Sequence, residues 1–405
     1  MNALTNPTAA APVGTAFKVA NIHAGEARMD LSTQWLARPA DERFLSLSDL
    51  KANTLARAEA TFEERVDTRK VEFVAPEIRT KADAPNMHKL TVGLPDGREV
   101  APTHWSFGQL AILAKAPAGY LRTLPSQISA DALSYGMRYN REAETLKLYG
   151  RAGLDLRAAT GPDYGRIFDH EVVDAVQQIA GNGTGDERWK IPGVMDWSSL
   201  VYDPEAPVTK DSTTLYASDR DVFVMLVDDR NPIVVGKTRD GSDDLMFRGF
   251  IVKNSEVGGG ALVIQTFYVR AICCNRILWG VERFEEVRMV HSKYAPSRFI
   301  EQARPALASF ADGSSARLIE GVEKAKAAKV AEDKDTALSF LADRGFTRKR
   351  SLDILEAVEN EEGHPARTVW DFAQGITAVA RAIPFTDERI EIERVAGKML
   401  DKVAA

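Results

Sequence analysis

The spacing of hydrophobic positions divides the chain into a strand-rich middle and a helical end. Between residues 197 and 291, runs rich in Val, Ile, Phe and Tyr recur, such as DVFVMLVDD and ALVIQTFYVRAICC. Such runs predict strands. Gly258-Gly259-Gly260 separates two of them, where a hairpin turn needs positive φ angles. From Ala295 onward, Ala and charged residues at helical spacing predict helices to the end of the chain.

The first part of the chain mixes both patterns. Leu, Ala and Phe recur at roughly helical spacing over residues 46–69, which predicts a helix, and a second helix is expected over 166–180. Residues 71–80 and 88–105 predict strands. The turn Pro95-Asp96-Gly97 lies within the second of these segments and indicates a hairpin.

Together these elements predict an α+β fold with a mixed, mainly antiparallel sheet core, flanking helices and a helical C-terminal region. Residues 1–30 are rich in Ala, Thr, Asn and Pro without a period, which is typical of a flexible tail. We expect a helical and extended segment over 31–84, a core domain over 85–310 and a helical region over 311–405.

Composition narrows the class of protein. Of the 405 residues, 44% are hydrophobic and 27% are charged, the balance of a globular protein. The net charge of -6 excludes a wholly basic coat protein, so a nucleic-acid site has to be a local patch. No apolar run is long enough for a bilayer, and the N-terminus lacks the features of a secretory signal. We therefore expect a cytoplasmic protein without a membrane partner.

Motifs for cofactors and metals are missing from the sequence. Neither GxxxxGK[ST] nor GxGxxG occurs, which argues against ATP chemistry through a P-loop. The six histidines have no metal-ligand spacing. The two cysteines, Cys273 and Cys274, are adjacent, so a disulfide scaffold is excluded and a reducing compartment is expected. We expect no cofactor and no metal.

Cys273, Asn275 and His291 form one candidate for chemistry. A cysteine nucleophile needs a histidine within hydrogen-bond reach, and a third group that orients this histidine. However, Cys273 lies in an apolar run, where a free cysteine is commonly a small buried hydrophobe. An enzyme that uses these three residues on a nucleotide or a peptide is therefore only the alternative to the leading hypothesis.

Basic and aromatic residues gather in 245–304. This segment has nine Arg and Lys residues and five Glu residues. Aromatic side chains lie between them. Cations can follow the phosphates of a nucleic acid, and aromatic rings can stack on unpaired bases. The competing interpretation is a surface sheet with Arg side chains at its rim and aromatic residues in its core.

Several motifs of the chain resemble those of one family. They are Asn254-Ser255-x-x-Gly258, Arg270-x-x-Cys273-x-Asn275, the segment HSKYA from His291, LRAATGPDY from Leu156 and DHEVV from Asp169. They resemble the phage/plasmid-like protein family, domain of unknown function 932, over roughly residues 100–310. Glu256 departs from the pattern, because many members carry His there. The resemblance implies a gene of phages or plasmids in a bacterial host, which favours a role in DNA handling by analogy of setting.

The leading hypothesis is a phage-type protein that binds single-stranded DNA and possesses ATP-independent annealing activity in recombination or replication. We expect a binding protein rather than an enzyme, and a homo-oligomer. A third alternative is a structural or host-interaction protein whose motif residues stabilise the sheet. The predicted DNA contacts are the cations Lys253, Arg270, Arg276, Arg288, Lys293 and Arg298, the aromatic residues Tyr268 and Trp279, and the neutral side chains Asn254, Ser255 and Asn275.

Overall fold

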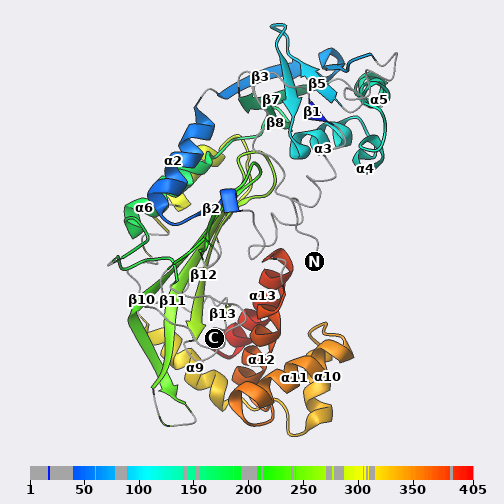
Figure 1. Ribbon diagram of the computed structural model, residues 1–405. Coiled ribbons are helices and arrows are strands. Elements are labelled where there is room, and N and C mark those ends of the chain that lie inside the picture. Colours follow the sequence, from blue (N-terminus) through cyan, green and yellow to red (C-terminus); the bar gives the residue numbers. More distant parts are fainter. Residues whose placement is uncertain are drawn as a thin grey trace.

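The computed structural model consists of two β-sheets, helices that cover them, and a helical C-terminal region (Figure 1). This confirms the predicted α+β class. The structure describes residues 17–18, 40–59, 61–77, 89–139, 144–151, 155–185, 187–192, 208–210, 213–238, 241, 243–270, 276–277, 287–303, 305–306, 309, 315–383 and 386–404.

The first sheet is mixed. Its path among the described strands is β1-β5-β6-β8-β7-β3, with β4 paired to β5. Only β6 and β8 run parallel among these pairs. The strands are β1 (Phe17–Lys18), β3 (Thr61–Asp67), β4 (Glu72–Val74), β5 (Lys89–Gly93), β6 (Glu99–Pro102), β7 (Thr145–Arg151) and β8 (Asp155–Thr160). The predicted hairpin around Pro95-Asp96-Gly97 is confirmed: it joins β5 to β6, and Gly97 has a φ of 86°.

Three helices contribute to the core of the first sheet. They are α3 (His104–Leu113), α4 (Ala118–Leu121) and α5 (Ser126–Tyr139). Phe107 of α3 and Leu133 of α5 are fully buried in one cluster with Val92 and Leu148 from the strands. Thr103 begins α3, because its hydroxyl accepts a hydrogen bond from the backbone N–H of Ser106 and so caps the helix.

The second sheet is antiparallel among its described strands, with the path β13-β12-β11-β10-β9-β2 and β14 paired to β12. The strands are β2 (Arg43–Phe44), β9 (Leu215–Ala217), β10 (Val222–Lys237), β11 (Asp243–Asn254), β12 (Leu262–Arg270), β13 (Arg276–Ile277) and β14 (Val287–Met289). The turn between β11 and β12 includes the predicted glycines, and Gly258 has a φ of 87°. This hairpin is therefore confirmed.

One face of the second sheet is covered by two groups of helices. At one end α2 (Leu47–Ala58) and α6 (Asp169–Ala180) share a cluster with Phe250 and Val252. At the other end the C-terminal helices share a cluster with Met246 and Tyr268. The long strands β10 and β11 run from one group to the other (Figure 1). They thereby link the N-terminal and C-terminal halves of the fold.

The C-terminal helices are α9 (Ala316–Ala327), α10 (Lys334–Ala342), α11 (Arg348–Glu362), α12 (Val369–Arg381) and α13 (Thr386–Ala404), preceded by α7 (Ala295–Arg298) and the π-helical turn η4 (Phe299–Ala303). Thr347 caps α11, and Gly363 ends it in the left-handed conformation. Some alanines of these helices pack inside the chain: Ala325, Ala373 and Ala396 are fully buried in one cluster.

The segment before residue 84 contributes to both sheets. The helix predicted over 46–69 ends at Ala58, and Thr61–Asp67 forms β3 instead, paired along its length with β7. The β-branched and aromatic residues of this stretch suit a strand, and sheet pairing overrides their helical spacing. Short 3-10 turns are η1 (Ala40–Glu42) and η2 (Thr68–Lys70). Apart from β1, the predicted tail over 1–30 lies outside the described residues.

Candidate functional site

The turn of the β11–β12 hairpin joins the second sheet to the first. The backbone carbonyls of Ser255, Glu256 and Val257 accept hydrogen bonds from side chains far away in the sequence, in α3 and in the segment between β8 and α6. The donors are Tyr164 Oη at 3.0 Å from the Ser255 oxygen, Arg166 Nη1 on Glu256, and both Trp105 Nε1 and Gln109 Nε2 at 2.9 Å from the Val257 oxygen. Each residue of the turn is thus held by a side chain from outside it. We name residues 255–257, together with the side chains that bind them, the joint.

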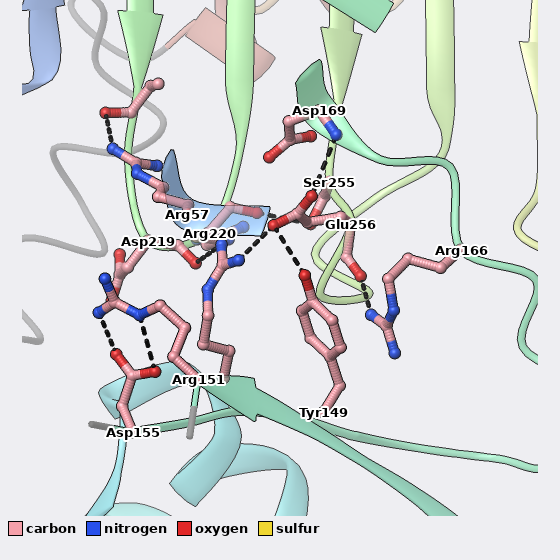
Figure 2. Close-up of polar contacts among 12 residues, drawn as sticks. Arg57, Tyr149, Arg151, Asp155, Arg166, Asp169, Asp219, Arg220, Ser255 and Glu256 are labelled. Carbon is pink, nitrogen blue, oxygen red and sulfur yellow. Dashed lines mark hydrogen bonds and ion pairs between the residues drawn. The ribbon is translucent and has the colours of Figure 1, made fainter. Parts of the chain in front are cut away.

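The side chain of Glu256 lies at the centre of this joint (Figure 2). Its Oε1 accepts hydrogen bonds from Arg157 Nη1 and from Tyr149 Oη, the latter at 3.4 Å. Its Oε2 accepts the backbone N–H of Asp169, at 3.0 Å, at the start of α6. Glu256 is 1% exposed and Arg157 is 2% exposed, so this is a fully buried ion pair. One carboxylate therefore links β7, β8 and α6.

The pKa values of the two buried carboxyl groups, Asp169 and Glu256, are shifted in opposite directions. Burial raises the pKa of Asp169 well above its ordinary value of 3.8, and the negative charge of Glu256 raises it further. Burial acts to raise the pKa of Glu256 as well, but four effects together hold that pKa below the ordinary 4.5: the charge of Arg157, the hydrogen bonds from the Asp169 N–H and from Arg157, and the charge of Arg166. Asn254 Nδ2 donates to Asp169 Oδ1 at 2.8 Å and to the Ile167 carbonyl at 2.9 Å.

His291 also belongs to the joint. Its ring stacks on Tyr164, with centroids 5.0 Å apart and planes 10° apart. Its Nδ1 lies 3.1 Å from the Gly165 carbonyl and 3.4 Å from the backbone N of Ile167. The nearer partner is an acceptor, so we assign the proton to Nδ1. Burial lowers the pKa of His291, which keeps the ring neutral. A Cβ at position 165 would lie 1.9 Å from the Ser292 carbonyl, so this close approach requires glycine.

These contacts bear on the enzyme hypothesis. A catalytic acid or base has to reach its substrate, yet Glu256 and Asp169 are buried and engaged within the joint. The described contacts of the His291 ring are with the backbone at residues 165 and 167 and with Tyr164. Cys273 and Asn275 lie outside the described residues. The contacts described here thus position the two halves of the fold.

Four of the predicted DNA contacts lie inside the protein. Asn254 is fully buried and holds Ile167 and Asp169, as given above. Ser255 Oγ donates to the Arg220 carbonyl at 2.6 Å and accepts the N–H of Gly259 at 2.7 Å. Ser255 thus stabilises the turn, and Asn254 connects the end of β11 to the start of α6; both have the structural role that the third alternative gave them. Tyr268 is 1% exposed and packs against the C-terminal helices.

Arg270 is the fourth buried residue, and it lies between sheet and helices. Its guanidinium forms a bidentate pair with Asp244, with distances of 2.7 and 3.0 Å, and a second pair with Glu362 at the end of α11. Its Cζ lies 5.7 Å from the ring centroid of Trp370. Asp244 also receives Lys326 Nζ at 3.3 Å. A phosphate contact does not fit this environment, because the buried guanidinium is already paired with two carboxylates.

The remaining described cations lie at the surface. Arg288, Lys293 and Arg298 are exposed, and Lys253 is half-buried. The backbone of Arg276 pairs with Val269 as part of β13, and nothing further is described for its side chain. Trp279 lies outside the described residues.

One exposed aromatic residue of this region, Tyr294, is absent from the predicted contacts. Tyr294 is 61% exposed, and Lys293 Nζ lies 4.9 Å from its ring centroid. The sequence held a usable signal. Tyr268 is flanked by Phe267 and Val269 in an apolar run, whereas Tyr294 follows His-Ser-Lys and precedes a proline two positions later. Glu256 was noted only as a departure from a pattern, since its partners are far away in the sequence.

The described residues contain neither a metal site nor a membrane-spanning helix. Within the described ranges, no three His, Cys, Asp or Glu side chains group as a metal site requires. In the same part of the chain, no helix has the length and apolarity needed to cross a membrane. Comparison with protein-family models, curated proteins and solved structures finds no match of any of the three kinds. The resemblance to the phage/plasmid-like family stays a prediction.

Proposed function

We propose that this protein binds single-stranded DNA through a surface formed by Lys253, Arg288, Lys293, Tyr294 and Arg298, here named the basic–aromatic strip. The observation that carries the proposal is the exposed Tyr294 ring with Lys293 Nζ beside it. Over residues 287–303 the chain has three Arg or Lys side chains and one carboxylate, although the whole protein is acidic. A local basic patch on an acidic body is what a nucleic-acid site requires here.

The sheet register supports a shared face for two of the cations. Lys253 of β11 pairs with Val263 of β12, and Val263 pairs with Arg288 of β14. Residues that pair directly across neighbouring strands project to the same side of a sheet. Neighbouring strands are about 4.8 Å apart, so the two backbones lie roughly 10 Å apart. Both side chains therefore lie on one side of the sheet, within reach of one strand of nucleic acid.

The strip is attached directly to the joint around Glu256. Ser292 forms a β-bridge with Tyr164, and the N–H of Gly165 donates to the His291 carbonyl at 3.1 Å. Lys293 and Tyr294 follow directly, and α7 begins at Ala295. A site on a fixed segment loses less conformational entropy on binding than one on a free loop. The joint around Glu256 thus has the role of a scaffold for the strip.

A single strand suits the strip better than a duplex, because an exposed ring can stack only on a base whose face is free. Such stacking tolerates any base, and the sequence offers no P-loop for ATP. The activity proposed is therefore sequence-tolerant binding, and in its fuller form ATP-independent annealing within the cytoplasm of a bacterial host. In annealing, no covalent bond is made and base pairing provides the free energy.

Fluorescence anisotropy with a labelled single strand tests the proposal. Stacking on one aromatic side chain contributes about 1–3 kcal/mol per base, so Tyr294→Ala is expected to weaken binding by roughly 5-fold to 150-fold. Tyr120→Ala is the matched control, since Tyr120 on α4 is also 61% exposed. Equal affinities of both variants and the wild type, or no binding to any single strand at low salt, would overturn the proposal.

A further inference from the structure

We propose that the outer face of α5 is a homodimer interface, on which α5 of a second copy of this chain packs antiparallel. The proposal adds an assembly surface to the DNA-binding function, but its test does not depend on DNA. The observations are an exposed apolar stripe, its heptad spacing, and charges that complement themselves in one orientation.

The α5 helix has apolar residues on two faces. Its inner face buries Leu133 and Met137 in the core of the first sheet. On the outside Ile128 is 52% exposed, Tyr135 is 61% exposed and Tyr139 is 70% exposed. The two tyrosine rings pack together with centroids 5.0 Å apart. A helix that is apolar on a second, exposed face indicates a surface for a partner.

The spacing of the three exposed residues together with the half-buried Ala132 is that of a coiled-coil seam. Ile128, Ala132, Tyr135 and Tyr139 follow one another by four, three and four positions, which corresponds to alternating d and a positions of a heptad. We name these four residues the α5 stripe. In an antiparallel pair, Ile128 of one copy meets Tyr139 of the other, and Ala132 meets Tyr135. Each small or aliphatic residue thus faces a large ring, which fills the space evenly.

The flanking charges select a second copy in this orientation. Asp131 and Arg138 are exposed and lie seven positions apart, on the same edge of the stripe. The antiparallel arrangement brings Asp131 of each copy near Arg138 of the other, twice over. In a parallel pair, Asp131 would instead lie level with Asp131 of the other copy, and Arg138 level with Arg138, so opposite charges would not meet. With one acid and one base at its edge, the stripe also lacks the positive excess that would favour a nucleic acid.

The expected interface is small. The exposed parts of the two tyrosine rings amount to about 250 Å² per copy, if an aromatic side chain presents about 200 Å². Even with neighbouring residues included, this lies at the low end of specific interfaces, below about 1,200 Å² in total. We therefore expect a reversible dimer whose mass depends on protein concentration. Ala325, Ala373 and Ala396 of the C-terminal helices, by contrast, are buried inside the chain.

Sedimentation velocity on the full chain without DNA tests the proposal. The wild type is expected to shift from monomer to dimer as its concentration rises, and Tyr135→Ala with Tyr139→Ala is expected to stay monomeric. Asp131→Arg alone and Arg138→Asp alone should each weaken the dimer, while the two together should restore it. Circular dichroism checks that all of these surface variants remain folded.

Tyr294→Ala is the control, because it belongs to the basic–aromatic strip and should leave the mass unchanged. Three results would overturn the proposal: a monomer at every concentration, an association that the Tyr135 and Tyr139 changes leave intact, or no recovery in the double charge reversal. Loss of DNA affinity with unchanged mass in the tyrosine variants would show instead that α5 stacks on bases. Failure of DNA binding alone would not affect this result.

Discussion

Replacing Glu256 by Gln changes one buried charge and almost no volume. Arg157 then keeps its positive charge in a site where both partners are at most 2% exposed. The new amide also cannot serve all of its neighbours. Its single oxygen faces either Arg157 or the N–H of Asp169, and its NH₂ group then points at the other donor. Removing one partner of a buried pair costs about 3–5 kcal/mol.

Urea unfolding followed by tryptophan fluorescence measures this loss, and Trp105 reports directly on the joint because its indole donates to Val257. With a slope m of about 3 kcal/mol/M, a loss of about 4 kcal/mol lowers the midpoint by about 1.3 M. Glu320→Gln is the matched control: Glu320 is 65% exposed and pairs with Lys324 within α9. The free energy of unfolding of Glu320→Gln should differ from that of the wild type by at most about 0.5 kcal/mol.

The double variant with Met at both positions 157 and 256 sharpens the test. Removing both charges together leaves neither Arg157 nor Glu256 charged without its partner, so the double variant should be more stable than the sum of its single changes implies. If Glu256→Gln unfolds at the same urea concentration as Glu320→Gln, the pair does not hold the joint, and the reasoning is refuted.

Two further predictions concern buried charges. The folded protein retains a proton on Asp169 that the unfolded chain loses near the ordinary pKa of 3.8, so its free energy of unfolding falls as pH rises through the raised folded pKa. Asp169→Asn removes this term, so its stability relative to wild type should rise in urea melts as the pH increases above the ordinary pKa of 3.8; a constant difference would contradict it. Arg270→Ala leaves Asp244 buried and should cost about 3–5 kcal/mol without changing DNA affinity in folded protein. Lys237→Ala, which removes the partner of the exposed Asp243, is its control, and a fully stable Arg270→Ala would contradict the assignment.

Much of the fold followed from local signals in the sequence. The turns at Gly97 and Gly258 need positive φ angles, and the hairpins were placed on that basis. The C-terminal helices were visible from their spacing, as was α6. The strand β3 was not, because its pairing with β7 joins residues that are 78 to 90 positions apart. Local propensity cannot report such a partner.

The site was harder to predict than the fold. Whether an arginine faces solvent depends on what the other elements place beside it, and Arg270 meets Glu362 from a distant helix. The sequence left both outcomes open for this residue. Glu256 carried no local signal at all, because Arg157 and Asp169 are brought to it by the packing of the two halves. The exposed Tyr294 had a signal in its polar neighbours.

The most direct test of the proposed DNA site is the salt dependence of single-strand affinity. Four phosphate contacts, from Lys253, Arg288, Lys293 and Arg298, predict a slope of log affinity against log salt of about -2.8. Changing the last three to Ala should reduce it to about -0.7. The control triple of Lys334→Ala, Arg348→Ala and Lys349→Ala alters net charge equally, at exposed positions of the C-terminal region, and should keep the wild-type slope. Equal slopes in both triple variants would contradict the basic–aromatic strip as the DNA site.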